Sequence, residues 1–277
     1  MVRLPQYFVN FNMFKPVFQL LIAVALFFGL WHLLAKVNWM HIFKVELRIK
    51  KSQRRIADLY LEFLRKEHKE IEVDSGYAPI DTLFTRLCTS NGIDRNSVQL
   101  HIFNSEEINA FALPGGHLVL YTALLQDCRN EAELSSVIAH ELAHIQKKHV
   151  VKKLLKEVGL NFLLIYTKSG AGGEVLVRVG KALSSTAYDR SLEQEADLQG
   201  AEYMINAGMN AGAMADFLAR LGETNKNKFQ ISWLSTHPDS KSRADYIRAY
   251  IANKHYKMQQ VLAPGTWEKL KQLSIDN

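Results

Sequence analysis

The stretch HELAHIQKKH, residues 140–149, places three histidines and a glutamate within ten positions of a 277-residue chain that holds 10 histidines in all. Successive helical residues turn by about 100 degrees, so His140 and His144 lie on one helix face with Glu141 beside them. His149 lies on the opposite side of an unbroken helix and is not expected to reach the same metal ion. The spacing predicts two ligands of one ion next to a carboxylate that can act as a base.

The later segment SLEQEADLQGAEYM offers a third ligand. Glu193 and Asp197 are four residues apart and share a helix face, whereas Glu195 points about 200 degrees away from Glu193. Such a pair suits one ligand plus a carboxylate that orients a metal-bound histidine, although an acidic surface helix has the same spacing. The pattern HExxHxxGxxH, with a histidine as third ligand, is excluded because positions 147 and 150 hold Lys147 and Val150.

The surroundings of these motifs predict an α+β fold that is mainly helical with a small β-sheet. Asn130 followed by Glu133 is a capping pattern that places the first motif inside a helix, and nearly everything after residue 122 has helical spacing. Residues 97–121 are the clearest strand region, with Pro114-Gly115-Gly116 as a turn between two short strands.

One strand of so small a sheet is expected to be an exposed edge, within 109–113 or 117–120. A protein or peptide substrate could add to that edge as an extended strand, although both segments could equally be core strands. Residues 159–166, with the glycine-rich 168–173, could form a mobile lid, and a core helix end is the alternative.

The N-terminus predicts a membrane anchor. Residues 17–35 are 19 consecutive positions without a formally charged side chain, and about 20 helical residues cross a bilayer's hydrocarbon core. A cleaved signal peptide is the alternative, but no A-x-A pattern follows the apolar run. Two basic residues precede the span and seven follow it before residue 56, which favours a cytoplasmic location for the rest of the chain.

These patterns divide the chain into five expected parts. They are an N-terminal tail (1–16), the anchor (17–35), a juxtamembrane amphipathic helix (36–74), a domain that contains both motifs (75–255) and a C-terminal tail (256–277). The basic first half of the amphipathic helix could rest on anionic lipid, or it could be an ordinary solvated helix face.

Charge and cysteine content exclude other classes. The net charge is +6 and the pI about 9.1, but the basic residues are concentrated after the apolar span and along one helix, so no nucleic acid partner is expected. Cys88 and Cys128 are 40 positions apart without CxxC spacing, which indicates neither a thiolate metal site nor a disulfide framework.

Four separated motifs, NAFALPGG, HELAH, EQEAD and HPDSKSR, occur in this order over roughly residues 75–255. Together they resemble the gluzincin metallopeptidases of family forty-eight, which implies that residues 75–255 form a zincin-type zinc metallopeptidase domain. The resemblance implies one zinc ion per chain with His140, His144 and Glu193 as ligands. It implies that Glu141 is the general base and that Asp197 orients a ligating histidine.

The resemblance extends to His237 and Arg243 in HPDSKSR, which match the family's histidine and arginine beyond the zinc helices. Both could donate to the oxyanion of the tetrahedral intermediate. In the BepA-like branch the corresponding histidine acts as a latch on the metal, so His237 has two alternative roles. With a single predicted span the chain is similar to the BepA-like or OMA-like members. The BepA-like relatives suggest a periplasmic domain, whereas the charge bias favours a cytoplasmic one.

The expected function is therefore a membrane-anchored zinc metalloendopeptidase, with protein quality control at the membrane or envelope implied by the resemblance. A zinc ion would activate water and polarise the scissile carbonyl, while Glu141 would take the proton of the attacking water. The alternative is a latent or inactive zinc-binding protein with a chaperone-like or scaffold role. The sequence leaves the oligomeric state open.

Overall fold

The computed structural model describes residues 14–36, 45–73, 76–159, 172–184, 187–223, 232–238 and 240–276. The chain divides into two compact units, Met1–Arg48 and Ile49–Asn277. The strands are β1 (Glu70–Ile71), β2 (Gln99–Phe103), β3 (Ala110–Leu113) and β4 (His117–Tyr121). The helices are α1 (Phe14–Lys36), α3 (Val45–Glu67), α4 (Ala78–Ser90), the 3-10 helix η2 (Arg95–Ser97), α5 (Thr122–Asp127), α6 (Glu131–Gln146), α7 (His149–Val158), α9 (Gly172–Ser184), α10 (Arg190–Asn206), α11 (Ala213–Glu223), α12 (Ser232–Thr236), α13 (Ser240–Ile251) and α14 (Thr266–Asp276).

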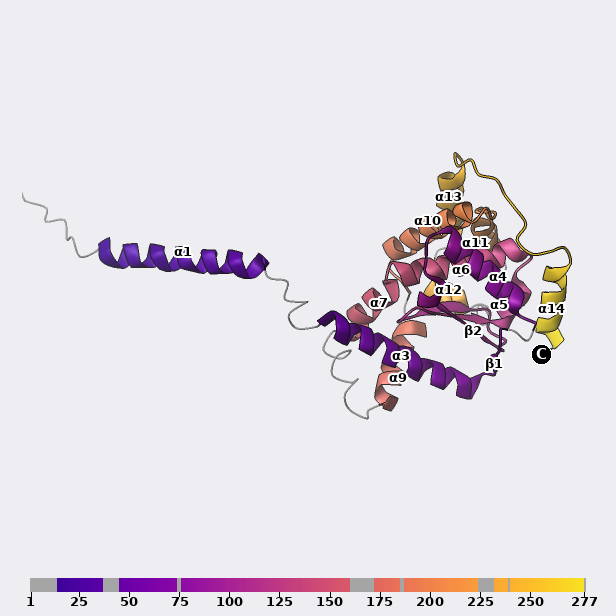
Figure 1. Cartoon of the computed structure of the whole chain (residues 1–277), viewed down its shortest axis with the longest axis horizontal. Coiled ribbons are helices and arrows are strands. Elements are labelled where there is room, and N and C mark those ends of the chain that lie inside the picture. Colours follow the sequence, from indigo (N-terminus) through magenta and orange to yellow (C-terminus); the bar gives the residue numbers. More distant parts are fainter. Residues whose placement is uncertain are drawn as a thin grey trace, which may run out of the picture. The chain divides into compact units, whose positions relative to one another are not determined.

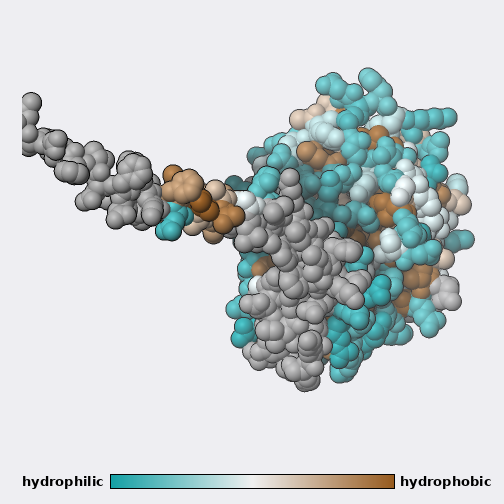
Figure 2. Space-filling model, turned by 60° about the vertical axis from the view of Figure 1, so that its left-hand side comes forward, coloured by the Kyte–Doolittle hydropathy of each residue, from teal (hydrophilic) through white to brown (hydrophobic). Residues whose placement is uncertain are grey.

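Helix α1 of the first unit covers the predicted anchor. Its described side chains are mostly hydrophobic, as the brown segment in Figure 2 shows, and Phe18, Leu26 and Phe28 are each more than 60% exposed. In the described part of the chain, no helix meets both the length and the hydropathy needed to cross a bilayer. The anchor at 17–35 therefore stays a prediction.

The second unit is built on a four-stranded sheet with the order β1-β2-β4-β3. β2 and β4 are parallel, and the other two pairs are antiparallel. The predicted turn joins β3 to β4: Gly115 and Gly116 both have positive φ, and a Cβ on Gly116 would lie 2.3 Å from the Ser97 carbonyl oxygen. Of the two candidate edges, β3 is at the edge of the sheet and β4 is internal.

Helices cover both faces of this sheet. On one face Ile102 and Leu118 join the main hydrophobic core with residues of α4, α6, α10 and α11. On the other face Phe103 and Val119 pack with residues of α3, α7 and α9. In Figure 1 the sheet separates α4, α6 and α11 above it from α3 and α9 below it. The predicted α+β architecture, mainly helical with a small sheet, is confirmed.

The segments on either side of residues 75–255 differ in detail from the expectations. The amphipathic helix α3 is present and buries Tyr60 and Leu64, but it ends at Glu67 because residues 70–71 pair with β2 as strand β1. Residues 256–277, expected to form a tail, include α14, whose Trp267 and Leu270 are buried in the main core. Most of the expected lid lies outside the described residues, since 160–171 are not among them.

Candidate metal centre

The first motif lies in α6, as its capping pattern predicts. The Asn130 side chain accepts hydrogen bonds from the backbone N–H groups of Ala132 and Glu133, each at 3.0 Å. The Glu133 carboxylate accepts from the backbone N–H of Arg129 rather than from that of Asn130. Because α6 is covered by the sheet on one side and α10 on the other, its histidines lie in the interior.

Close packing of α6 against α10 brings the two motifs together. A Cβ on Gly200 of α10 would lie only 3.2 Å from the backbone nitrogen of His140, so the glycine permits this approach. Glu193 and Asp197, on the α10 face predicted from their spacing, are both buried there. Glu195 is on another face, with 41% of its side chain exposed.

Four side chains converge at this contact. One ligand atom from each of His140, His144, Glu193 and His237 lies within 4.8 Å of the other three. The Nε2 atoms of His140 and His144 are 3.0 Å apart, and His144 Nε2 is 3.3 Å from Glu193 Oε1. Two ligand atoms of one tetrahedral zinc ion lie about 3.3–3.5 Å apart, given zinc–nitrogen bonds of about 2.0–2.1 Å.

The donor set fits zinc. Two imidazoles and a carboxylate are the ligand types of catalytic zinc sites. The Nε2 atoms of His140 and His144, 3.0 Å apart, would repel each other if both were unprotonated, unless a cation lay between them. No other group of three or more potential metal ligands occurs among the residues that the structure describes.

The pKa shifts of His144 and Glu193 favour metal binding, whereas for His140 the contact with Asp197 outweighs burial and raises the pKa. Burial holds the pKa of His144 well below its usual value. Burial alone would raise the pKa of Glu193, but the charge of His237 and the contacts with His144 and His237 outweigh it and hold that pKa well below its usual range. An ionised carboxylate and a neutral imidazole are the forms that bind a metal ion.

His237 lies among the ligand atoms rather than beside them. Its Nδ1 is 3.2 Å from His140 Nε2 and 2.9 Å from Glu193 Oε1. Its other ring nitrogen, Nε2, is buried without a hydrogen-bond partner among the described residues, 3.3 Å from Glu141 Oε1. His237 follows directly on α12, whose first turn is attached to the segment before β3 through the Trp233 N–H and the Ile108 carbonyl.

The guanidinium group of Arg243 contacts two buried carboxylates. Its Nε and Nη2 donate to the two Asp197 oxygens at 2.8 Å each, and its Nη1 lies 2.8 Å from Glu193 Oε2. Nη1 also donates to the backbone carbonyl of His237. Asp197 in turn lies beside His140, with Oδ1 2.9 Å from Nδ1. This is the position that a carboxylate needs in order to orient the His140 ring.

Glu141 is completely buried at the edge of the sheet. Its Oε2 accepts from the backbone N–H of Ala112 in β3, and its Oε1 accepts from the indole N–H of Trp233, both at 3.1 Å. The carboxylate thus lies between the edge strand and α12, next to the ligand cluster.

His149 lies outside the cluster of four side chains, but it contacts His144 instead of facing away from it, because the helix breaks. α6 ends at Gln146, and Lys148 adopts a left-handed conformation with φ 57°, the one positive φ at a described non-glycine residue. α7 then begins at His149 with a new orientation. The His149 ring is buried, with Nδ1 3.1 Å from His144 Nδ1.

Other residues at the site were not expected from the sequence. Trp233 packs its ring against His140 and His237, and the Tyr188 ring lies on His144 with 4.2 Å between centroids. The Tyr246 hydroxyl donates to Asp197. A signal did exist for two of these: Trp233 is four residues before His237, and Tyr246 is three after Arg243, which is helical spacing around HPDSKSR.

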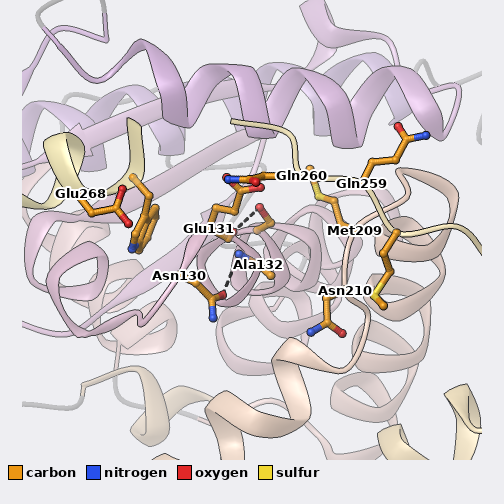
Figure 3. A pocket seen from close by; sticks show the side chains of 11 residues that line it. Asn130, Glu131, Ala132, Met209, Asn210, Gln259, Gln260 and Glu268 are labelled. Atoms are coloured by element: carbon orange, nitrogen blue, oxygen red, sulfur yellow. Dashed lines mark hydrogen bonds between the residues drawn. The ribbon is translucent and has the colours of Figure 1, made fainter. Parts of the chain in front are cut away.

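The cavities differ in their relation to the cluster. A cavity of about 400 Å³ lies at the opposite end of α6, next to the Asn130 cap, and none of the four clustered residues lines it (Figure 3). A second, of about 350 Å³, is lined by His144, by Leu113 at the end of β3 and by the turn at Gly115. Of these two cavities, the second reaches the cluster.

Comparison with known proteins agrees with this geometry. The profile of Peptidase family M48 matches residues 77–251, more than half of the chain. The beta-barrel assembly-enhancing protease of Escherichia coli K12 is 30% identical over 230 residues, covering 72% of this chain and 45% of that protein. The bovine mitochondrial metalloendopeptidase OMA1 is 28% identical over 220 residues, covering 72% and 42%.

A shorter relative is covered more completely. The metalloprotease LoiP of Escherichia coli K12 is 26% identical over 193 residues, which are 65% of this chain and 75% of that protein. The chain spans less than half the length of the beta-barrel assembly-enhancing proteases that it matches.

Proposed function

Because the chain belongs to peptidase family M48, we propose that it is a zinc metalloendopeptidase with one zinc ion per chain, held by His140, His144 and Glu193. The observation that carries the proposal is the convergence of these buried side chains beside the carboxylate of Glu141. The intact glutamate favours a peptidase over a zinc-binding scaffold protein, which would have no need of a base there.

The residues divide the chemistry among them. When bound, zinc polarises the scissile carbonyl and makes water more acidic. Glu141 accepts the proton of the attacking water and then delivers a proton to the departing amine. Asp197 orients His140, and Arg243 fixes Asp197 and Glu193 through its guanidinium group. These contacts favour a positioning role for Arg243 over the oxyanion-donor role.

The substrate is a protein or peptide that adds to β3 as an extended strand. Support comes from the position of β3 at the edge of the sheet and from the Ala112 N–H, which donates to Glu141 rather than to another strand. A peptide along this edge would bring its scissile bond next to Glu141. A backbone hydrogen bond from Trp233 to Ile108 holds α12 at the start of this edge. A bound peptide therefore has to displace α12.

His237 acts as a latch on the metal centre in this state of the chain. The latch role is supported over the oxyanion-donor role by the location of Nδ1, which is as close to Glu193 and His140 as a fourth ligand would be. A residue that donates to the oxyanion would have to lie beside the metal position that water and substrate occupy, and not in it.

We expect His237→Ala to increase casein hydrolysis by about 10-fold or more, because the variant opens a position on the metal that catalytic zinc sites keep for water. The measurement is hydrolysis of fluorescently labelled casein together with zinc content per chain. His255→Ala, at an exposed histidine, is the control. A fall in activity at unchanged zinc content would assign His237 to the oxyanion instead. Absence of zinc from the unmodified chain would contradict the proposed function itself.

The proposal includes a single-pass membrane location through residues 17–35 and a role in protein quality control. The exposed apolar side chains of α1 support the first part, and the names of the relatives, which are a mitochondrial metalloendopeptidase and proteases of beta-barrel assembly, support the second. We expect the full chain to stay with membranes after alkaline carbonate extraction and a chain starting at residue 37 to be released. Release of both would contradict the anchor.

A further inference from the structure

His149 and Glu195 form a line of contacts behind the ligand His144. His149 Nδ1 lies 3.1 Å from His144 Nδ1, and His149 Nε2 lies 3.1 Å from Glu195 Oε2. Lys147 Nζ lies 3.2 Å from the other Glu195 oxygen. The line starts at the buried cluster and ends at a half-exposed carboxylate, and both of its outer members were expected to face away from the metal.

A single arrangement of protons satisfies every atom of this line. His144 must present an unprotonated Nε2 to bind a metal ion, so its proton is on Nδ1. That N–H donates to Nδ1 of His149, which then carries its own proton on Nε2. The second N–H donates to the Glu195 carboxylate, and no ring nitrogen is left without a partner.

We propose that His149 and Glu195 are positioning residues of the metal centre, which hold His144 in the tautomer and orientation that metal binding requires. The inference rests on the proposed zinc site. The partner on the N–H of a ligating histidine fixes its ring and raises its basicity. Asp197 has this role for His140, so the two histidine ligands are oriented separately, one by a buried carboxylate and the other through an imidazole.

The left-handed residue Lys148 makes the arrangement possible. In a continuous helix a residue five positions after His144 would be rotated by about 140 degrees from it. The reversal at Lys148 returns the His149 ring to His144, and it starts α7 at that residue. The same break lets α10 present Glu195 to His149 while Glu193, two residues earlier, faces the ligand cluster.

The test is zinc affinity, measured on the full chain by competition with a chelator, with Zn²⁺ itself as the probe. We expect His149→Ala to weaken zinc binding by about 10–100-fold and Glu195→Ala by about 10-fold, the range found for partners of metal-bound histidines. Glu195→Gln keeps an acceptor for the His149 N–H and is expected to retain most of the affinity. Glu202→Ala is the matched control, because Glu202 lies on the same helix and pairs with a lysine, Lys254, without contacting a histidine.

The outcomes separate the inference from the proposed function. If the unmodified chain binds no zinc, the proposed function fails. If it binds zinc, and Glu195→Ala binds it as tightly as Glu202→Ala does, the positioning role is wrong. His149 is buried, so its variant could fail to fold, which the thermal unfolding of the metal-free chain would reveal. In that case the half-exposed Glu195 decides the result, because its substitution leaves the core intact.

Discussion

Replacing Glu141 with glutamine is expected to lower kcat for casein hydrolysis by about 10²–10⁴-fold, the contribution of a well-placed general base, while zinc content is unchanged. A glutamine cannot take a proton from water, but it has the size of the glutamate. Glu141 is not among the proposed ligands, and its carboxylate is held by Ala112 and Trp233 instead. The comparison is made in the His237→Ala background, where the proposed latch is absent.

Glu106→Gln is the matched control, since Glu106 is an exposed glutamate of the same region that contacts none of the clustered residues. Equal hydrolysis by the Glu141→Gln variant and its parent would remove Glu141 from the mechanism. Loss of zinc along with activity would instead give Glu141 a role in building the site. The inactive variant can also trap a peptide, and a bound peptide paired with any strand other than β3 would contradict the proposed binding mode.

Arg243→Ala is expected to lower the free energy of unfolding of the metal-free chain by about 3–5 kcal/mol, the cost of removing one partner from a buried ion pair. The substitution would leave the carboxylates of Asp197 and Glu193 buried without their counter-ion. Urea unfolding of the metal-free protein measures the effect. An oxyanion donor would behave differently, because its loss would lower kcat and leave unfolding unchanged.

Two variants control for the loss of an arginine. Arg248 lies on α13 like Arg243, and Arg248→Ala removes an exposed ion pair with Asp216. Such pairs contribute about 0–1 kcal/mol. Arg243→Lys keeps the charge but loses the two parallel hydrogen bonds to Asp197, so its stability should fall between those of Arg243→Ala and the unmodified chain. A lysine variant as stable as the unmodified chain would show that the charge alone matters.

The same ion pair predicts a pH dependence for the Arg243→Ala comparison. Burial alone would raise the pKa of Asp197, but the charge of Arg243 and the contact with His140 outweigh it, so the pKa is lower than usual. The pair therefore contributes its full stability above the unfolded pKa of about 3.9, and the contribution is lost as pH falls through the lowered folded value. The difference between the unmodified chain and Arg243→Ala should shrink below about pH 4.

Local patterns predicted the elements of the fold that carry the site. The Asn130 cap and the helical spacing placed His140 and His144 on one face of α6, and the two glycines predicted the β3–β4 turn. Strand β1 was missed because it has only two residues, which form a strand only through their pairing with β2. The C-terminal segment was expected to be a tail, because the sequence around α14 does not reveal that Trp267 and Leu270 pack into the main core.

Sequence spacing alone predicted which side chains share a helix face at the metal centre: the ligands His140 and His144 on one helix, and the ligand Glu193 with the orienting Asp197 on the other. Helical periodicity is a local property, and each pair is four residues apart. What surrounds these pairs depends on how the helices pack. The tertiary structure directs Arg243 to the carboxylates, brings His237 among the ligand atoms and returns His149 to His144 across the break at Lys148. These contacts depend on packing between segments distant in the chain, and on one backbone reversal that no local spacing encodes.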